Sequence, residues 1–198
     1  MKALRQLESA ALAIPRANVD TDQIVPARFL KRPRSEDFGE ALFHDQPQLR
    51  GTARRGEARI VVAGRNFGCG SSREHAVWAL YDYGFRAAIA PSFGDIFRSN
   101  ALKNGFLPVV LPEEAVMAML EALAHAPGVR IAIDLERQSV TAPGGALHRF
   151  DIEPFARQCL LEGQDELDYT LTQAARIDRK STRLNSSHPY VSRMPSSA

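Results

Sequence analysis

The chain is organised around one stretch of sequence: Gly64-Arg65-Asn66-Phe67-Gly68-Cys69-Gly70-Ser71-Ser72-Arg73-Glu74-His75-Ala76. It follows an apolar run of strand composition, residues 60–63, and leads into a segment in which Ala76, Ala79, Leu80 and Tyr83 recur at helical spacing. The glycines allow backbone conformations that other residues resist. The stretch therefore predicts a buried strand, a glycine-rich turn, and a helix that ends at Gly84.

The start of the predicted helix has the chemistry of an anion site. We expect Ser71 or Ser72 to be the N-cap, with Glu74 in the first turn. The unpaired N–H groups of a helix N-terminus attract a carboxylate or a phosphate. Arg73 adds a guanidinium that can hold a carboxylate through two hydrogen bonds. The simpler alternative is a serine-capped turn without a ligand.

Two common phosphate-binding motifs are excluded at this turn. A P-loop requires a Lys-Ser or Lys-Thr pair after the glycines, and none follows here. A dinucleotide-binding turn requires Gly-x-Gly-x-x-Gly, which is also missing from the stretch. The turn is therefore neither of these two phosphate-binding motifs.

The composition is that of one globular domain followed by a different kind of tail. The chain has 198 residues, of which 44% are hydrophobic and 24% charged. Its net charge is +2, yet residues 1–178 carry 21 Lys/Arg and 23 Asp/Glu, a net charge of −2. The basic excess lies in residues 179–198, which are rich in serine and have no apolar period. We expect a domain at 1–178 and a disordered, non-native tail at 179–198.

The charge distribution and the hydropathy exclude two classes of partner. A basic excess confined to the tail gives little support to nucleic-acid binding. No run approaches the roughly 20 apolar residues of a membrane span. The polar N-terminus lacks the apolar core of a signal peptide, so we expect a cytoplasmic protein.

The candidate metal ligands and nucleophiles are few. Two cysteines, Cys69 and Cys159, cannot form a disulfide framework, and they are too few for an iron–sulfur cluster, which usually needs three or four thiolates. Asp20 and Asp22 lack a third ligand at suitable spacing, so no metal site is expected. Cys69 and His75 would be the nucleophile and base of a cysteine hydrolase. Six residues apart across a turn, they are not expected to meet, and we assign His75 a structural role.

Strands and helices are expected to alternate along the rest of the domain. We predict strands at 10–14, 60–63, 86–90, 106–111, 129–135 and 138–141, and another around Phe150 and Ile152. We predict helices at 72–84, 92–104, from 112 to about 126, 154–162 and 165–176. Residues 18–27 read as a turn, and residues 29–55 as a basic loop packed down by its phenylalanines. This order predicts a layered α/β domain with some antiparallel sheet.

Three motifs in this order resemble a known family. In chain order they are the segment Asn18–Ala27 (the first motif), Gly70-Ser71-Ser72-Arg73-Glu74-His75 within the stretch 64–76 (the second motif), and the segment Pro91–Phe97 (the third motif). Together they closely resemble the small, swivelling domain of the aconitase family, and the order and length of the blocks are similar to the small subunits of bacterial 3-isopropylmalate dehydratases. The resemblance implies an aconitase-like swivelling β/β/α fold, a single layered domain with a mixed sheet.

The resemblance also implies a reaction, a partner and a cofactor. The reaction is the isomerisation of 2-isopropylmalate to 3-isopropylmalate by dehydration and rehydration, a step of leucine biosynthesis. The enzyme is a heteromeric hydro-lyase, active only when a large subunit joins the small one. Its [4Fe–4S] cluster is carried by that large subunit, and this chain alone is expected to bind none.

The resemblance assigns roles to individual residues. Ser71 is the expected catalytic base, and Ser72 and Arg73 are expected to bind a substrate carboxylate. Asp22, in the first motif, is expected to support the catalytic hydrogen-bond network. Apart from the resemblance, Lys31 is the basic loop residue nearest that motif and the candidate to face the dicarboxylate. A solvated surface is the simpler alternative for this basic loop.

Two alternatives remain open. The chain could be the small subunit of a related hydro-lyase of the homoaconitase, citramalate or dimethylmalate type. It could also be a non-catalytic anion-binding module, although the presence of both Ser71 and Arg73 argues against this. The sequence does not decide which 2-hydroxydiacid is preferred, nor the oligomeric state of the isolated chain.

Overall fold

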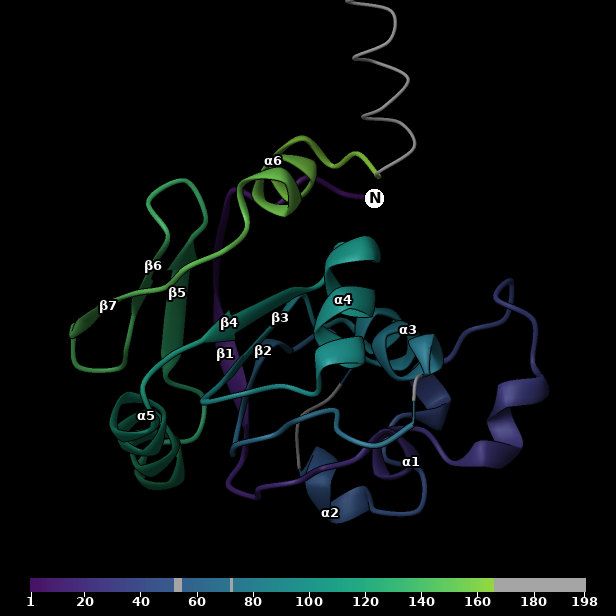
Figure 1. The fold of residues 1–198 in the computed structure, drawn as a ribbon. Helices are drawn as coiled ribbons and strands as arrows, with labels where there is room; N and C mark the ends of the chain where they lie inside the picture. The colour runs from purple at the N-terminus through teal and green to yellow at the C-terminus, as the bar shows by residue number, and fades with distance from the viewer. Residues whose placement is uncertain (52–54, 72, 166–198) are drawn as a thin grey trace, which may run out of the picture. The chain divides into compact units, whose positions relative to one another are not determined.

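A seven-stranded mixed sheet runs through the domain in the order β4-β3-β2-β1-β5-β6-β7. The computed structural model describes residues 1–51, 55–71 and 73–165 (Figure 1). Strands β1 to β4 are parallel to one another, and β5, β6 and β7 continue the sheet in antiparallel fashion from β1. The strands are β1 (Gln6–Ile14), β2 (Ala58–Ala63), β3 (Ala87–Ala90), β4 (Leu107–Val110), β5 (Arg130–Asp134), β6 (Ser139–Thr141) and β7 (Leu147–Arg149).

Helices cover both faces of the parallel half of the sheet. The longer helices are α3 (Glu74–Tyr83), α4 (Asp95–Lys103), α5 (Glu113–His125) and α6 (Pro154–Glu162). Helices α3 and α4 lie on one face and α5 on the other (Figure 1). The shorter helical turns are α1 (Thr21–Ile24), η1 (Ala27–Lys31), η2 (Gly39–Ala41) and α2 (Pro47–Arg50).

Strand β2 shows why these residues form a central strand. Ile60 and Val62 belong to the buried cluster beneath α5, whereas Val61 and Ala63 belong to the cluster beneath α3 and α4. All four side chains are fully buried. A strand covered on both faces needs an apolar residue at every position, and this explains the unbroken run at 60–63.

The predicted α/β class with a mixed sheet is confirmed, and several element boundaries differ. Strand β1 begins at Gln6, four residues before the predicted start, because residues 6–10 pair with β5. Helix α4 begins at Asp95 rather than at Ser92, because Phe93 continues in extended form and bridges to Phe67. The predicted helix at 165–176 and the tail at 179–198 lie outside the described residues.

The strand predicted around Phe150 and Ile152 is wrong. Strand β7 instead ends at Arg149, and its pairing with β6 covers residues 147–149. The backbone of Phe150 donates a hydrogen bond to the Gln138 carbonyl at 3.0 Å, and its ring is buried. The apolar residue at 150 is therefore explained by burial of its side chain just after β7 ends, and not by a further strand.

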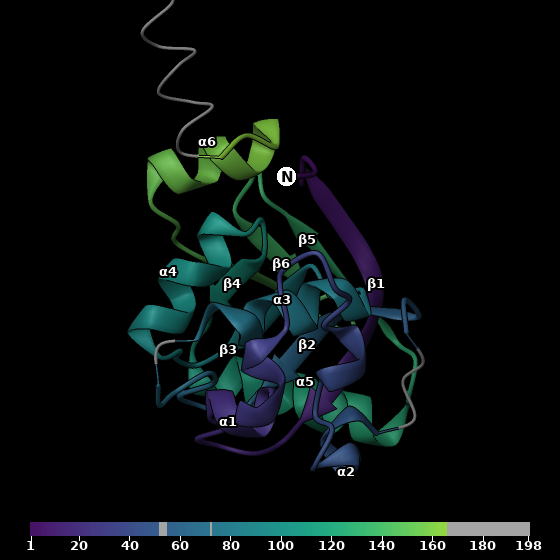
Figure 2. The same ribbon diagram turned by 90° about the vertical axis from the view of Figure 1, so that its right-hand side faces the viewer.

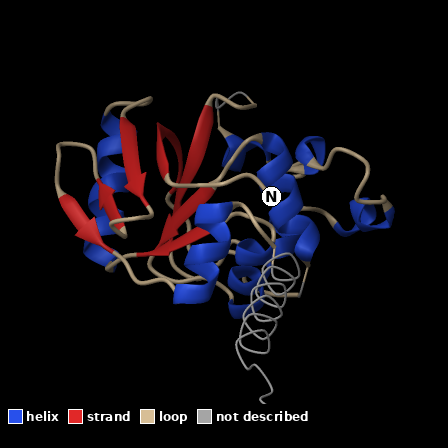
Figure 3. Ribbon diagram, turned by 90° about the horizontal axis from the view of Figure 1, so that it is seen from above, coloured by secondary structure: helices blue, strands red, loops and turns tan. Residues whose placement is uncertain are grey.

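The segment from Asn18 to Gly51 forms a cap on the α3 side of the sheet (Figures 2 and 3). The predicted turn at 18–27 contains the short helix α1, whose N-cap Asp20 accepts a hydrogen bond from the Gln23 N–H at 2.7 Å. The prediction that phenylalanines pack the loop down is confirmed, because Phe38 and Phe43 are fully buried.

Among the described residues, no helix is long and apolar enough to cross a membrane.

Candidate functional site

The first two sequence motifs meet beyond the carboxyl ends of β1 and β2. The N–H of Asn18 donates to the Arg65 carbonyl at 2.9 Å, and the N–H of Gly68 donates to the Val19 carbonyl at 2.8 Å. The N–H of Thr21 then donates to the Cys69 carbonyl at 2.9 Å. The two segments therefore continue the parallel pairing of their strands after the sheet proper has ended.

The third motif joins the same edge from β3. The N–H of Phe67 donates to the Ser92 carbonyl at 3.1 Å, and the N–H of Gly94 donates to the Phe67 carbonyl at 3.0 Å. The Ser92 hydroxyl also accepts a hydrogen bond from the Asn66 N–H at 2.8 Å. Three motifs far apart in the sequence thus lie side by side at the carboxyl ends of neighbouring parallel strands, the edge at which open α/β sheets bind ligands.

Close backbone approach at this edge requires glycine at two positions. Gly68 has φ of 73°, and a Cβ added there would lie 2.3 Å from Cγ of Phe97. A Cβ added to Gly94 would lie 2.5 Å from the Gly68 carbonyl oxygen. Any other residue would separate the second motif from the third.

Arg73 and Asp22 form an ion pair that joins the first two motifs directly. The Arg73 side chain is 19% exposed, whereas that of Asp22 is 53% exposed. Asp22 lies in the first turn of α1, and Arg73 precedes the first turn of α3. The guanidinium is therefore held at the start of α3 by a carboxylate from the neighbouring motif.

The N-cap of α3 is Arg73, so the prediction of Ser71 or Ser72 as the N-cap is wrong. The physical reason lies in Thr21, whose hydroxyl donates a hydrogen bond to the Ser71 carbonyl at 3.0 Å. This bond keeps the chain at Ser71 in the turn, so the helix starts after it. Ser71 is exposed at the edge of the site, and Ser72 lies outside the described residues.

Lys31 lies at the end of η1 and is exposed. The preceding residue, Leu30, is half-buried and packs against the apolar cluster that includes α3. Of the predicted site residues that the structure describes, it brings Asp22, Ser71 and Arg73 into one cluster. It does not bring Lys31 into this cluster.

Cys69 and His75 do not have the environments of a nucleophile and its base. Burial, with a further contribution from the charge of Asp20, raises the pKa of the Cys69 thiol, which keeps it protonated. The ring of His75 lies 4.6 Å from that of Trp78 and 5.4 Å from that of Phe38. Burial lowers the pKa of His75, and the charge of Arg73 acts in the same direction. The predicted packing role of His75 is confirmed.

Thr21 and Asn66 are the contributors that the sequence analysis missed. Thr21 is a buried polar residue whose hydroxyl holds the backbone of Ser71. Asn66 has φ of 59°, and its side chain donates to the Asn18 side chain at 2.8 Å. A turn-forming asparagine or threonine is a weak signal in sequence, because such residues bond to the nearest backbone in most turns.

Within residues 1–51, 55–71 and 73–165, no group of three or more His, Cys, Asp or Glu side chains is arranged to hold a metal ion. The site consists instead of the Ser71 hydroxyl, the Arg73 guanidinium, the Asp22 carboxylate and the N-terminus of α3. This set of groups suits an organic anion.

The fold and this edge site define a swivelling domain of the aconitase type. Residues 48–114 match the family model described as Aconitase C-terminal domain, and residues 118–154 match the model described as LeuD_N. A crystal structure of 3-isopropylmalate dehydratase from Methanocaldococcus jannaschii has the same fold, with a TM-score of 0.67 and 24% identity, covering 88% of this chain and 99% of that one.

Sequence relatives define the family more closely. The 3-isopropylmalate dehydratase small subunit of Anaeromyxobacter sp. strain K is 49% identical over 187 residues, covering 89% of this chain and 96% of the relative. The small subunit 2 of Bordetella pertussis is 43% identical over 215 residues, covering 98% and 99%. The chain belongs to the family of 3-isopropylmalate dehydratase small subunits. The resemblance stated from the three motifs is thereby confirmed.

Proposed function

We propose that this chain is the small subunit of a heteromeric hydro-lyase that isomerises 2-isopropylmalate to 3-isopropylmalate in leucine biosynthesis. Relatives named as such small subunits, 43–49% identical over most of the chain, support the proposal. The observation that carries it is the cluster of Ser71, Arg73 and Asp22 at the carboxyl edge of the parallel strands. In this cluster the residue that carries the hydroxyl, Ser71, lies near the Arg73 guanidinium, which can bind a carboxylate. Both residues lie at the N-terminus of α3.

In this proposal Ser71 removes the carbon-bound proton of the substrate. A free serine hydroxyl is a very weak acid, so it serves as a base only as an alkoxide stabilised by its surroundings. The N-terminus of α3 supplies partial positive charge, and the Arg73 guanidinium supplies a full one. The hydrogen bond from Thr21 to the Ser71 carbonyl fixes the backbone from which the hydroxyl projects.

Arg73 binds a substrate carboxylate and thereby orients the reacting carbon toward Ser71. The ion pair with Asp22 engages Nη1 of the guanidinium, which has further N–H groups for a carboxylate. Asp22 is in this view a positioning residue that aims the guanidinium. Ser72 is proposed to bind the same substrate carboxylate as Arg73. Lys31 is proposed to bind the second carboxylate, at the other end of the substrate.

The proposed partner is a large subunit that completes the active site. A [4Fe–4S] cluster supplies Lewis-acid chemistry toward the hydroxyl and a carboxylate when it is bound. The whole sequence contains two cysteines, Cys69 and Cys159, and Cys159 is buried in α6. Because a cluster of this kind usually needs three or four thiolates, we assign it to the large subunit. We further propose that the two subunits form a heterodimer in the cytoplasm, and that neither nucleic acid nor a membrane is a partner.

Co-expression with candidate large subunits, followed by anaerobic cluster reconstitution, tests the proposal. The assembled enzyme is assayed on a panel of 2-hydroxydiacids that includes 2-isopropylmalate, homocitrate, citramalate and dimethylmalate. We expect turnover of 2-isopropylmalate above that of the others, and none from this chain alone. Preference for another diacid would indicate a related hydro-lyase, and a chain that assembles without any turnover would indicate a binding module. Either result contradicts the proposal.

A further inference from the structure

Helix α3 is attached to the cap, residues 18–51, at both of its ends. At the start of the helix, Arg73 is paired with Asp22 of α1. At the other end, Asp82 lies in the last turn of α3, and its side chain is only 15% exposed. Asp82 follows Arg73 by nine residues, which is about 13 Å along a helix. The second attachment is therefore remote from the site.

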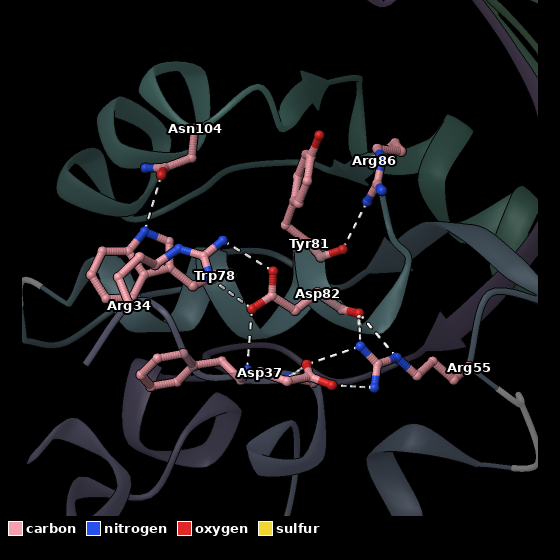
Figure 4. A network of polar contacts seen from close by, with 10 residues as sticks. Arg34, Asp37, Arg55, Trp78, Tyr81, Asp82, Arg86 and Asn104 are labelled. Carbon is pink, nitrogen blue, oxygen red and sulfur yellow. Dashed lines mark hydrogen bonds and ion pairs between the residues drawn. The ribbon is translucent and has the colours of Figure 1, made fainter. Parts of the chain in front are cut away.

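Two residues of the cap bind the Asp82 carboxylate (Figure 4). The Arg34 guanidinium donates two hydrogen bonds to the two carboxylate oxygens, at 2.9 and 3.0 Å. The N–H of Phe38 donates a third, at 3.1 Å. A bidentate pair of this kind fixes geometry as well as charge. The Arg34 side chain is 45% exposed, so solvent screens part of the attraction.

A second arginine secures the same region through the backbone of Asp82. Arg55 donates to the Asp82 carbonyl at 3.1 and 2.6 Å, and to the Asp37 carboxylate at 2.9 Å (Figure 4). Asp37 in turn accepts a hydrogen bond from the Gly39 N–H at 2.8 Å. Residues 34–39 of the cap are therefore held against the last turn of α3.

The held segment leads back to α1 through printed backbone and side-chain contacts of the cap. Phe38 is fully buried, and five residues later Phe43 is fully buried as well. The N–H of Phe43 donates to the carbonyl of Ile24, in α1, at 2.8 Å. Helix α1 carries Asp22, the partner of Arg73. A continuous series of contacts thus runs from Asp82 through the cap to the ion pair at the site.

The ion pair at the site is the attachment that a substrate would disturb. In the proposed function, Arg73 also binds a substrate carboxylate. Asp22 and that carboxylate then share one guanidinium, and their like charges repel each other. The contact between α1 and α3 is weakened as a result. The attachment at Asp82 includes no group that the substrate is proposed to touch, so it is unchanged by binding.

We propose that Asp82 is a positioning residue for substrate binding: together with Arg34 it holds the cap on α3, so that Asp22 stays beside Arg73 when a carboxylate binds there. The inference rests on the proposed function, in which Arg73 is the carboxylate-binding residue. Asp82 touches no reacting atom and acts through residues 34–43 and α1. Its loss therefore weakens substrate binding and leaves the chemistry at Ser71 largely unchanged.

Three variants of the full chain test this role. Arg34→Ala removes the bidentate pair by changing an exposed side chain, and it leaves the carboxylate as the acceptor for Phe38. Arg34→Lys keeps the charge without the two-point grip. Asp82→Asn keeps an oxygen acceptor for Phe38 and removes the charge. The matched control is Arg130→Ala, because Arg130 forms an exposed ion pair with Glu8 on the neighbouring strands β5 and β1.

The first readout is hydrogen exchange on the chain alone, which requires neither the large subunit nor a substrate. We expect the amides of residues 38–43 to exchange about two- to tenfold faster in Arg34→Ala and Asp82→Asn, while those of α5 are unchanged. Arg34→Lys should lie between Arg34→Ala and wild type, and Arg130→Ala should match wild type at 38–43. Unchanged exchange at 38–43 in Arg34→Ala would overturn the proposal. An equal acceleration in α5 would also overturn it, because it would show a loss of overall stability.

The second readout is steady-state kinetics of the assembled enzyme on 2-isopropylmalate. We expect KM to rise about two- to tenfold in Arg34→Ala with kcat within twofold of wild type, and Arg34→Lys to recover part of the loss. Arg130→Ala should match wild type. An unchanged KM, or a fall in kcat at constant KM, would contradict the positioning role. A wild-type enzyme without turnover would instead contradict the proposed function, and the exchange result alone would then decide whether Asp82 holds the cap.

Discussion

At the scale of single residues, the side chains at the start of α3 are each held by a partner from another segment. Arg73 is paired with Asp22, and the Ser71 backbone is bonded to Thr21. The ring of His75 lies 5.4 Å from that of Phe38. Since these partners come from residues 21–38, the geometry of the proposed site depends on the contact between that segment and α3.

Replacing Arg73 by lysine should impair the assembled enzyme although the charge is kept. Lysine is a compact point charge without the planar fork of a guanidinium, so it cannot bond to Asp22 and grip a carboxylate with two parallel hydrogen bonds. A hydrogen bond to a charged group is worth about 1.5–3 kcal/mol, so kcat/KM should fall about tenfold to hundredfold. Steady-state kinetics beside Arg98→Lys, an exposed arginine on α4, checks this. Wild-type values of both kcat and KM would remove Arg73 from substrate binding.

The environment of His75 predicts a pH dependence of stability. Because burial lowers its pKa in the folded chain, the unfolded state takes up the proton first as the pH falls. The contribution to the free energy of unfolding is therefore complete above about pH 6.5 and is lost as the pH falls below that value. Denaturant unfolding at pH 7.5 and 5.5 should show a smaller loss for His75→Gln than for wild type or for His125→Gln. Equal losses in all three chains would be evidence against a lowered pKa.

At the scale of elements, the site is built by three strand ends rather than by one motif. The glycine-rich turn after β2 lies between the segments that follow β1 and β3. The tight packing of Gly68 and Gly94 allows these three chains to lie side by side. The helix α3 then starts from the middle of this arrangement.

Gly68→Ala tests the close packing of the second motif against the third. The new Cβ would lie 2.3 Å from the Phe97 ring, in addition to the strain of φ at 73°. Gly144→Ala is the matched control, since its φ is 87° but a Cβ there would meet open space among the described residues. We expect Gly68→Ala to lower the free energy of unfolding by about 1–3 kcal/mol more than Gly144→Ala does. Equal effects in denaturant titrations would contradict the packing described here.

The order of elements could be predicted from the sequence, and the contacts between motifs could not. The run at 60–63, the helix ending at Gly84 and the helix at 154–162 follow from local patterns. The Arg73–Asp22 pair depends on the parallel register of β1 and β2, which no local pattern reveals. The N-cap of α3 was predicted wrongly for the same reason, because the bond from Thr21 comes from 50 residues away.

At the scale of the whole molecule, the chain combines a swivelling domain with a terminal segment of different composition. Residues 179–198 contain four basic and no acidic residues and lack an apolar period. The prediction that the functional domain ends near residue 178 follows from this change of composition.

Removal of residues 179–198 should therefore leave the domain unchanged, because a segment without an apolar period has little to contribute to a core. We expect the melting temperature to stay within about 1–2 °C, and the affinity for the large subunit to remain the same. Thermal unfolding and a binding titration of the full and shortened chains check this. A clear fall in either quantity would show that the terminal segment belongs to the working molecule.

In the proposed function, the exposed Ser71 at the start of α3 acts in the chemistry of the assembled enzyme. The most direct test is kcat for 2-isopropylmalate with Ser71→Ala, compared with wild type and with Ser99→Ala, an exposed serine on α4. Because Arg73 rather than Ser71 is the N-cap, Ser71→Ala should fold and assemble like wild type. We predict a fall in kcat of about a hundredfold or more, the range expected for loss of a general base. A kcat for Ser71→Ala close to that of wild type and of Ser99→Ala would contradict it.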